Sequence, residues 1–397
     1  MIFSFDNPRK DGVDLSKARS TKEILAEADQ KGAQHHGPTF EQVTSCHNSE
    51  DIILIDEYFA KIQDFKTVID VRSPTEFKDS HLPGAINFPI LDNYERREVG
   101  ILYKERGKHI ATQKALEFAS PKLEALKNSI PINSKCVIYC WRGGGRSGFV
   151  HGSLTKMGFK NIKRLRGGYK AYRRWVHNKL YNEQYPKLII VKGLTGVGKS
   201  ELLRCIQEYF QVLDLEHCAG HCASSFGSIP YEIKREYEIP SQKLFEDRIF
   251  AQLYLSESLA SSAGILVESE SRRIGHRKVP PALYEAMLQS NTIEVVASLD
   301  SRVERIYREY VGHEQSGVRL LQRDLEKIKR YISSELYNRM KNSLKNGEIR
   351  NFISECLTNY YDHRYAGYYE KTNLLTIDNS VAENGKSQLI SFLNNHH

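Results

Sequence analysis

Short apolar runs alternate with longer stretches of helical periodicity along most of the chain. The apolar runs, each bounded by polar or turn-forming residues, are Thr67–Val71, Cys136–Cys140, Leu188–Val191, Ile265–Glu268 and Ile293–Leu299. Strands that alternate with helices are joined by crossover connections, so this pattern predicts mainly parallel sheets and an α/β fold. After about Ser301 the pattern becomes helical, which predicts a helical C-terminal segment.

The length of 397 residues predicts more than one domain, because single hydrophobic cores stop growing at about 250–300 residues. Residues 1–50 are polar and show no sustained period, which is typical of an N-terminal extension. A basic helical stretch ends within 176–186, where Pro186 precedes a new apolar run. We therefore expect one domain over residues 51–178 and a second over residues 186–397.

Composition favours a soluble globular protein, with 40% hydrophobic and 27% charged residues. No uncharged apolar run approaches the roughly 18 residues needed to span a bilayer, so no membrane partner is expected. Asp6, Asp11 and Asp14 argue against a secretory or transit peptide. Seven cysteines without such a signal predict a reducing compartment. We expect a cytoplasmic monomer.

The net charge of +8 is unevenly distributed, because the segment from Cys140 to Asn182 contains 11 Lys and Arg residues and no acidic residue. Tyr169, Tyr172, Trp175 and Tyr181 are interleaved with these cations. The combination favours a phosphate-rich partner with stackable bases, such as RNA, although a solvated helix face is an alternative interpretation. The candidate RNA-binding residues are Lys163, Arg164, Arg166, Lys170, Arg173 and Arg174.

A cysteine begins a glycine- and arginine-rich loop, Cys140–Ser147, directly after an apolar run. A thiol attacks as the thiolate, and its usual pKa of about 8.5 must be lowered for reaction near neutrality. Arg142 and Arg146 bring positive charge, and Gly143–Gly145 allow backbone N–H groups to turn inward around an anion. The helix expected after the loop adds a positive helix end. Cys140 is therefore the candidate nucleophile, with Arg142 and Arg146 as its catalytic partners.

A second motif, Gly193–Ser200, fits the G-x-x-x-x-G-K-[ST] pattern of a phosphate-binding loop in full. It lies between an apolar run and the helical stretch Glu201–Glu208, as this motif requires. Lys199 would reach the outer phosphates, and Ser200 could hold Mg²⁺. The candidate phosphate-binding residues are Gly193, Thr195, Gly196, Gly198, Lys199 and Ser200.

Two acidic residues, Glu268 and Glu270, end another apolar run. Either could act as an acid or base or bind a metal-held water, although many buried strands also end in an acid. His217, Cys218, His221 and Cys222 have i,i+4 pairs on an expected helix, but their spacing matches no usual structural zinc pattern. We therefore assign no metal to them.

Three further segments stand before and after the cysteine loop: Val68–Arg72, His81–Asn87 and Leu165–Tyr169. Together with that loop they resemble the rhodanese domain over about residues 51–175. It implies an α/β sulfurtransferase fold in which Cys140 carries sulfur or selenium. One departure is that five residues separate Cys140 from Arg146, where simple sulfurtransferases have four. The longer loop also resembles dual-specificity phosphatases of the same superfamily and would admit a tetrahedral phosphate-like group.

A rhodanese domain followed by a phosphate-binding-loop domain is similar to the tRNA 2-selenouridine synthases. The match continues through Asp92–Gly100, Gly167–Ala171, Ser224–Gly227 and Glu268–Gly275. This resemblance implies replacement of sulfur by selenium in the wobble 2-thiouridine of tRNA, with selenophosphate as donor. It also implies S-geranylation of that sulfur from geranyl diphosphate.

Two other functions remain open at this stage. A rhodanese-superfamily phosphatase or arsenate reductase would use Cys140 and Arg146 on phosphoryl groups, but it would not need the Gly193–Ser200 loop. A nucleotide-driven regulatory module with an inert rhodanese part would leave the intact cysteine loop unexplained. Turnover of an aryl phosphate, or nucleotide hydrolysis without RNA, would distinguish these functions.

Overall fold

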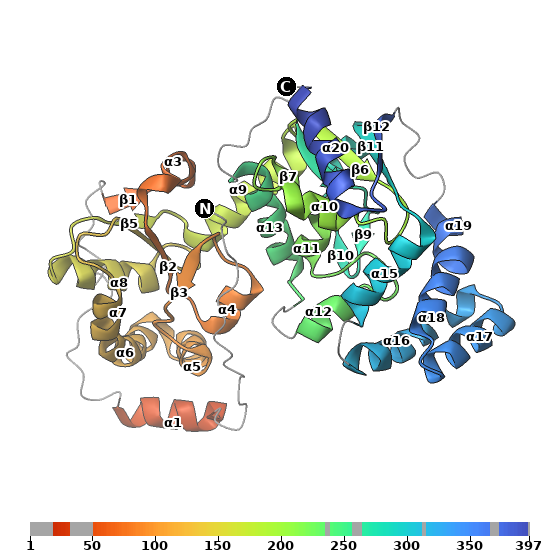
Figure 1. Cartoon of the computed structure of the whole chain (residues 1–397). Coiled ribbons are helices and arrows are strands. Elements are labelled where there is room, and N and C mark those ends of the chain that lie inside the picture. The colour runs from red at the N-terminus through yellow and green to blue at the C-terminus, as the bar shows by residue number, and fades with distance from the viewer. Residues whose placement is uncertain are drawn as a thin grey trace. The chain divides into compact units, whose positions relative to one another are not determined.

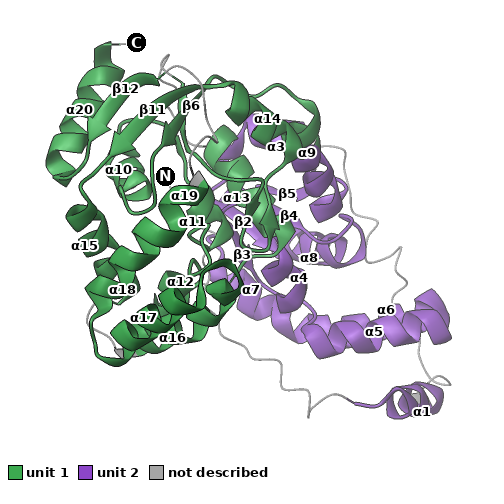
Figure 2. Ribbon diagram, turned by 90° about the vertical axis from the view of Figure 1, so that its right-hand side faces the viewer, with its two compact units in different colours: residues 1–2, 178–397 green, residues 3–177 purple. Residues whose placement is uncertain are grey.

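The structure, a computed structural model, describes residues 19–31, 51–234, 239–255, 264–311, 315–365 and 373–395. The chain divides into two compact units, residues 3–177 and residues 178–397 with the first two residues (Figure 1, Figure 2). The division falls within helix α9 (Gly168–Asn182). Each unit contains one five-stranded parallel sheet, which confirms the predicted α/β fold.

The sheet of the first unit has the strand order β1-β5-β4-β2-β3, with every neighbouring pair parallel. Its strands are β1 (Ile52–Ile53), β2 (Thr67–Asp70), β3 (Ala85–Asn87), β4 (Cys136–Tyr139) and β5 (Ile162–Leu165). All four residues of β4 are buried, as expected for a central parallel strand covered on both faces. Since β4 ends at Tyr139, Cys140 is the first residue after the strand, at the carboxyl edge of the sheet.

Helices flank this sheet. They are α3 (Ile55–Ala60), α4 (Pro74–Asp79), α5 (Asn93–Glu105), α6 (Gly107–Ala119), α7 (Leu123–Ser129), α8 (Gly145–Lys156) and the start of α9, with 3₁₀ turns at Ile62–Asp64 and Ser120–Lys122. The main core of the unit joins Ile69 and Ile138 of the sheet to Leu126 of α7 and Leu154 of α8. This packing holds α8, which follows the cysteine loop, against the sheet.

Part of the predicted N-terminal extension is helical. Helix α1 (Thr21–Lys31) buries Ile24 against Leu102 and Ala111 of the α5–α6 pair. Ion pairs such as Arg106–Asp29, with Nε 2.8 Å from the carboxylate oxygen, link the same elements. The sequence did not indicate this helix, because eleven residues with few apolar side chains give a weak periodic signal. Residues 1–18 and 32–50 lie outside the described residues.

The sheet of the second unit has the order β12-β11-β6-β8-β7, again with every pair parallel. Its strands are β6 (Leu188–Lys192), β7 (Val212–Leu213), β8 (Ile265–Glu268), β11 (Asn291–Val296) and β12 (Asn373–Asp378), and a separate hairpin pairs β9 (Arg273–Ile274) with β10 (Arg277–Lys278). Strand β6 is central, and the chain continues from it to strands on both sides. The carboxyl end of β6 is therefore a topological switch point, where α/β sheets bind ligands.

Some helices of this unit pack on the sheet, and others pack on one another around a separate core. They are α10 (Lys199–Ile206), α11 (Leu215–Ala219), α12 (Ile229–Lys234), α13 (Gln242–Tyr254), α14 (Pro281–Gln289), α15 (Leu299–Tyr310), α16 (Gln315–Ile328), α17 (Ser334–Lys345), α18 (Ile349–Cys356), α19 (Asp362–Tyr365) and α20 (Ala382–Asn395), with a 3₁₀ turn at Lys329–Tyr331 and a π-helical segment at Leu357–Tyr361. Side chains such as Leu203 of α10 and Leu389 of α20 pack with the sheet. Helices α12 and α15–α18 share a second core around Met340 and Phe352.

The C-terminal segment is mostly helical, as predicted, and it also contains one strand that the sequence pattern did not indicate. Strand β12 pairs with β11 over Thr292–Val296, far away in sequence. Most of its side chains are at least partly exposed and only Ile377 is fully buried, so its pattern lacks the apolar run of a central strand. Among the described residues, no helix is both long and apolar enough to cross a membrane.

Candidate active sites

The cysteine loop joins the end of β4 to the start of α8. Cys140 is buried, and its Sγ lies 3.2 Å from the Oγ of Ser147 in the first turn of α8. Helix α8 begins at Gly145, so the amino end of a twelve-residue helix, with its unpaired N–H groups, adjoins the loop. Such an end favours an anion or a thiolate.

Backbone contacts lock this loop against the start of α9. The N–H of Tyr169 donates to the carbonyl of Cys140 at 2.9 Å, and the N–H of Lys170 donates to that of Trp141 at 3.0 Å. A Cβ on Gly168, which has a φ of +55°, would lie 2.1 Å from the Cys140 carbonyl oxygen. Only glycine permits this approach, so the Gly-Gly-Tyr sequence after β5 has a structural role in holding Cys140.

The two candidate arginines of the loop have different environments. Arg142 is exposed, whereas Arg146 forms two hydrogen bonds with Glu76, at 2.7 Å from Nη1 and 3.1 Å from Nη2. Arg96 also contacts the Glu76 carboxylate, at 2.9 Å. Burial opposes ionisation of Glu76, but the hydrogen bonds and charge of Arg146 and the charge of Arg96 lower its pKa to about 2. Arg146 is therefore held by an ionised carboxylate.

Glu76 has a second role at the start of α4. In the capping box of this helix, the Glu76 carboxylate accepts from the backbone N–H of Ser73 at 3.1 Å, and the Ser73 side chain caps the N–H of Glu76. One carboxylate thus stabilises a helix start and orients an arginine of the cysteine loop. The capping pattern Ser73-Pro74-Thr75-Glu76 is visible in the sequence, but its partner seventy residues later is not.

The six candidate RNA-binding cations occupy two elements. Lys163 and Arg164 are adjacent residues of β5 and are partly buried. Neighbouring side chains of a strand point to opposite faces, so these two do not form one patch. Arg166, just before α9, is exposed, as are Lys170 and Arg174 within that helix, whereas Arg173 is partly buried.

The aromatic residues interleaved with these cations make contacts within the protein, which leaves them less available to stack on RNA than the sequence pattern indicates. Tyr169 and Tyr172 are buried. Trp175 stacks on Phe59, with ring centroids 4.3 Å apart, and its indole N–H donates to Asp56 at 2.5 Å. The Tyr181 hydroxyl lies 3.0 Å from a carboxylate oxygen of Glu246.

In the second unit, the phosphate-binding loop leaves the carboxyl end of β6 and leads into α10. Gly193, Gly196 and Gly198 have positive φ angles of 154°, 83° and 86°. A Cβ on Gly193 would lie 2.2 Å from the carbonyl oxygen of Val295, so β11 leaves no room for another residue there. The Lys199 Nζ folds over the loop and donates to the Gly193 carbonyl at 3.0 Å.

Side chains from distant parts of the sequence hold the outer surface of this loop. Arg302 of α15 donates from Nε to the carbonyl of Thr195 at 2.8 Å, and Asn379, after β12, donates to the carbonyl of Val197 at 2.8 Å. Arg302 also pairs with Asp362, 2.6 Å away. Because Arg302 and Asn379 hold two carbonyls of the loop by hydrogen bonds, the loop is stiffened before any ligand binds.

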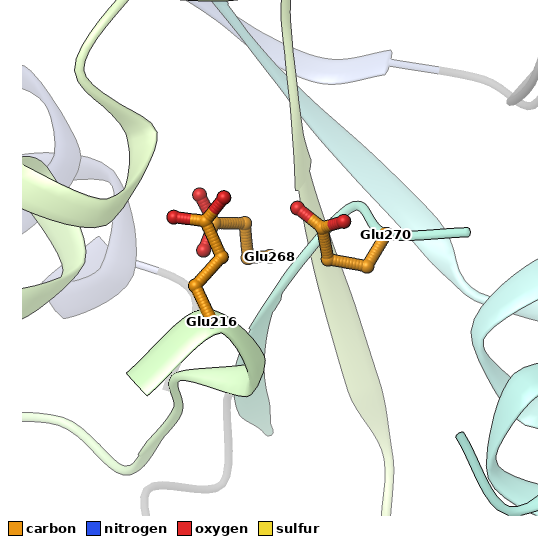
Figure 3. A group of neighbouring side chains, drawn as sticks. All are labelled: Glu216, Glu268 and Glu270. Atoms are coloured by element: carbon orange, nitrogen blue, oxygen red, sulfur yellow. The ribbon is translucent and has the colours of Figure 1, made fainter. Parts of the chain in front are cut away.

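Three carboxylates converge beside the loop, from Glu216 of α11, Glu268 at the end of β8 and Glu270 (Figure 3). One oxygen atom from each lies within 4.8 Å of the others. Strand register places Glu268 beside Val191, at the start of the loop. The Ser200 Oγ lies 2.6 Å from Glu268 Oε1 and 3.1 Å from Glu216 Oε2.

This cluster fits a divalent cation. Burial, together with the charges of neighbouring carboxylates, raises the pKa of Glu216, Glu268 and Glu270. Within the described part of the chain, Glu268 Oε2 is buried and has no hydrogen-bond partner. Carboxylate and hydroxyl oxygens are the ligands that Mg²⁺ prefers, and a cation would offset the clustered negative charge.

As far as the structure describes the chain, the four His and Cys residues that follow Glu216 do not form a metal site of their own. The expected helix through His217–Cys222 was wrong, because α11 ends at Ala219 and Gly220 has the left-handed φ of 63°. Burial raises the pKa of the Cys218 and Cys222 thiols, which disfavours the thiolate that zinc requires. The glutamate at the start of this segment, rather than its His and Cys residues, belongs to the acidic cluster.

Two family models match the chain. One, described as "tRNA 2-selenouridine synthase AAA domain", matches residues 186–397, and one described as "Rhodanese-like domain" matches residues 54–174. A tRNA 2-selenouridine synthase from Pseudomonas syringae pv. syringae is 31% identical over 331 residues, which are 75% of this chain and 87% of that relative. Another, from Nitrosomonas europaea, is 33% identical over 252 residues, 62% of this chain and 63% of that relative, so the match spans slightly less than two thirds of its length.

Solved structures also match parts of the chain. The N-terminal domain of a putative ATP/GTP binding protein from Clostridium difficile 630 is 39% identical, covers 32% of this chain and 98% of that one, and has a TM-score of 0.29. A rhodanese-related protein from Thermoplasma volcanium is 20% identical, covers 31% of this chain and 91% of that one, and has a TM-score of 0.21.

Proposed function

Because the chain belongs to the tRNA 2-selenouridine synthase family, we propose that it replaces the sulfur of the wobble 2-thiouridine of tRNA with selenium. Selenophosphate is the selenium donor, and S-geranyl-2-thiouridine, formed from geranyl diphosphate, is the intermediate. The observation that supports this most directly is the presence of two separate sites, a helix-capped cysteine loop and a phosphate-binding loop with an acidic cluster.

The phosphate-binding loop suits the geranylation step. The thiocarbonyl sulfur attacks the first carbon of geranyl diphosphate, the carbon–oxygen bond breaks, diphosphate leaves and the N3 proton of the base is lost. Lys199 and the loop amides stabilise the charge that develops on the diphosphate. Ser200, Glu216 and Glu268 would hold Mg²⁺, which when bound supplies further charge stabilisation to the leaving group.

The cysteine loop suits the selenium step. The Cys140 thiolate attacks C2 of the S-geranyl base and expels geranyl thiol. The selenium of selenophosphate then attacks C2 and displaces Cys140 as a thiolate. Water cleaves the phosphorus–selenium bond, phosphate leaves and 2-selenouridine is released. The α8 amino end and Arg142 attract the tetrahedral donor, and Arg146 contacts it from its position on Glu76.

Mass spectrometry of tRNA nucleosides tests this proposal. Purified protein is incubated with 2-thiouridine tRNA, geranyl diphosphate, selenophosphate and a small thiol. We expect 2-selenouridine with all components and S-geranyl-2-thiouridine when selenophosphate is omitted. Absence of both products, or turnover of an aryl phosphate at a comparable rate, would contradict the proposal.

A further inference from the structure

Trp141, the residue after Cys140, presents an exposed aromatic ring beside the nucleophile. About 37% of its surface is accessible, although large aromatic side chains usually gain from burial. The other tryptophan of the chain, Trp175, is stacked on Phe59. The ring of Trp141 is thus available to a ligand that approaches the cysteine loop.

Buried side chains that contact one another in sequence hold the Trp141 ring in place. The Trp141 ring packs on Tyr169, with centroids 5.2 Å apart and planes inclined by 34°. Tyr169 is buried, and the guanidinium of Arg72 lies 3.9 Å from its ring centroid. Arg72 is itself fully buried and paired with Asp70 at 2.5 Å. The exposed ring therefore rests on a rigid base.

The backbone of Trp141 is held as well. Its carbonyl accepts from the N–H of Lys170, and the preceding carbonyl accepts from the N–H of Tyr169. A ring fixed by both its neighbours and its backbone loses little freedom when it binds a planar ligand. Such preorganisation lowers the cost of recognition.

Exposed cations flank the ring. Arg142 follows Trp141 in the chain, and the Lys170 N–H donates to the Trp141 carbonyl. The side chains of Arg142 and Lys170 are both exposed. An aromatic platform with adjacent cations is the combination by which proteins bind unpaired nucleotides, with the base stacked and the phosphates neutralised. An apolar prenyl chain would use the ring but would gain nothing from the cations.

We propose that Trp141 is a stacking platform for the tRNA base on which Cys140 acts. The inference rests on the proposed function and assigns Trp141 as a positioning residue of the selenium-transfer step. Stacking would place C2 of the unpaired base in front of Cys140, and Arg142 and Lys170 would hold the neighbouring phosphates.

Tryptophan fluorescence tests the contact without any reaction. In the full-length W175F protein, which keeps an aromatic ring against Phe59, Trp141 is the sole tryptophan. The probe is an anticodon stem-loop RNA with 2-thiouridine at the wobble position, compared with the same RNA carrying an abasic wobble nucleotide. We expect quenching by the first RNA and little by the second. In a W141F protein, Trp175 emission should not change with either RNA.

Several results would overturn the inference. Equal quenching by the two RNAs would mean that Trp141 contacts only the backbone. Unchanged emission, while a labelled RNA shows binding by anisotropy, would mean no contact at all. Quenching by geranyl diphosphate alone, with none by RNA, would assign the ring to the prenyl chain.

Kinetics separate positioning from folding. With S-geranyl tRNA and selenophosphate, W141A should raise the KM for tRNA by about 5- to 150-fold, the range that base–aromatic stacking supplies, and W141F should retain most of the activity. Selenophosphate binding by the protein without tRNA, measured by equilibrium dialysis, should be unchanged in W141A, and its loss there would indicate a merely structural role. Wild-type protein that binds no selenophosphate would contradict the proposed function, while the fluorescence result would still decide the stacking.

Discussion

At the scale of single residues, the environment of Cys140 depends on a carboxylate outside its loop. Glu76 pairs with Arg146 and neutralises much of its charge, so the field at the thiol is weaker than two arginines alone would give. The α8 amino end and exposed Arg142 then supply a larger share of the attraction for an anion.

Substitution of Cys140 by alanine should abolish selenium incorporation and leave the fold intact, because alanine keeps Cβ and removes only Sγ, whose hydrogen-bond partner is the Ser147 hydroxyl. Nucleoside mass spectrometry measures the product, and circular dichroism checks folding. Cys205→Ala, at an exposed cysteine in the second unit, is the matched control and should remain active. Unchanged 2-selenouridine formation by Cys140→Ala would refute the assignment of the nucleophile.

The Glu76 pair should make stability depend on pH in the acid range. The pKa of Glu76 is lowered to about 2, so its ion pairs contribute fully above the ordinary carboxyl range. This contribution is lost as the pH falls toward 2, because the unfolded chain then binds the proton more readily. Urea unfolding at pH 7 should show Glu76→Gln less stable than wild type, with the difference shrinking as the pH falls toward 3.

A matched control is available on α3, where Glu57 pairs with Lys61 on the surface. Glu57→Gln should change stability little at any pH, because exposed ion pairs contribute little. If both variants showed the same loss in the free energy of unfolding with the same pH profile, the ion pairs of Glu76 would contribute no more than an exposed pair does.

At the scale of elements, the exposed cations just before α9 and along it are the testable part of the candidate RNA interface. Reversing the charges of Arg166, Lys170 and Arg174 should weaken tRNA binding and flatten its salt dependence by about 0.7–0.9 in log–log slope for each phosphate that is no longer neutralised. Filter binding across a salt series measures both. The same reversal at Arg330, Lys341 and Lys345, exposed in the second unit, is the control, and an equal effect there would indicate general charge attraction.

The acidic cluster should bind a divalent cation in the absence of substrate. Mg²⁺ should raise the unfolding temperature of the wild-type protein, because it offsets three clustered carboxylates. Glu268→Gln should lose this response, and Glu285→Gln, at a residue on the exposed face of α14, should retain it. Differential scanning fluorimetry gives the temperatures, and an equal Mg²⁺ response in all three proteins would place the cation elsewhere.

Apolar runs were sufficient to locate the central strands, because parallel strands buried on both faces leave an unbroken hydrophobic signal. The sequence also contains complete patterns for Cys140–Ser147 and Gly193–Ser200, because their backbones require glycines at fixed spacing. It does not reveal Glu76, Glu216 or Arg302. These residues act through contacts between segments far apart in the chain, and a single Glu or Arg has no local pattern that indicates such a partner.

At the scale of the whole molecule, the two sites belong to different compact units, so the two half-reactions should be separable. Lys199→Ala removes the cation that faces the leaving diphosphate and should slow S-geranylation by about 10²–10³-fold, the effect of one preorganised charge-stabilising donor. The same variant should still convert pre-geranylated tRNA to 2-selenouridine. Cys140→Ala should do the reverse and accumulate the geranylated intermediate.

Nucleoside analysis at early and late times distinguishes the two variants. If each blocks both steps equally, the phosphate-binding loop positions RNA or drives the whole cycle, and the division of labour is wrong. Cys140→Ala supplied with geranyl diphosphate alone is the reference for the first step.

The position of strand β12 late in the second unit affects how the protein folds during its synthesis on the ribosome. Asn379, which donates to the Val197 carbonyl of the Gly193–Ser200 loop, is synthesised 182 residues after Val197, and the buried Leu389 and Leu393 follow it. The first unit has all its strands by residue 165 and can fold while translation continues. The second unit cannot be completed before Asn379 and Leu393 have been synthesised, so a chain truncated before Asn379 should have a folded cysteine domain joined to an incomplete phosphate-binding domain.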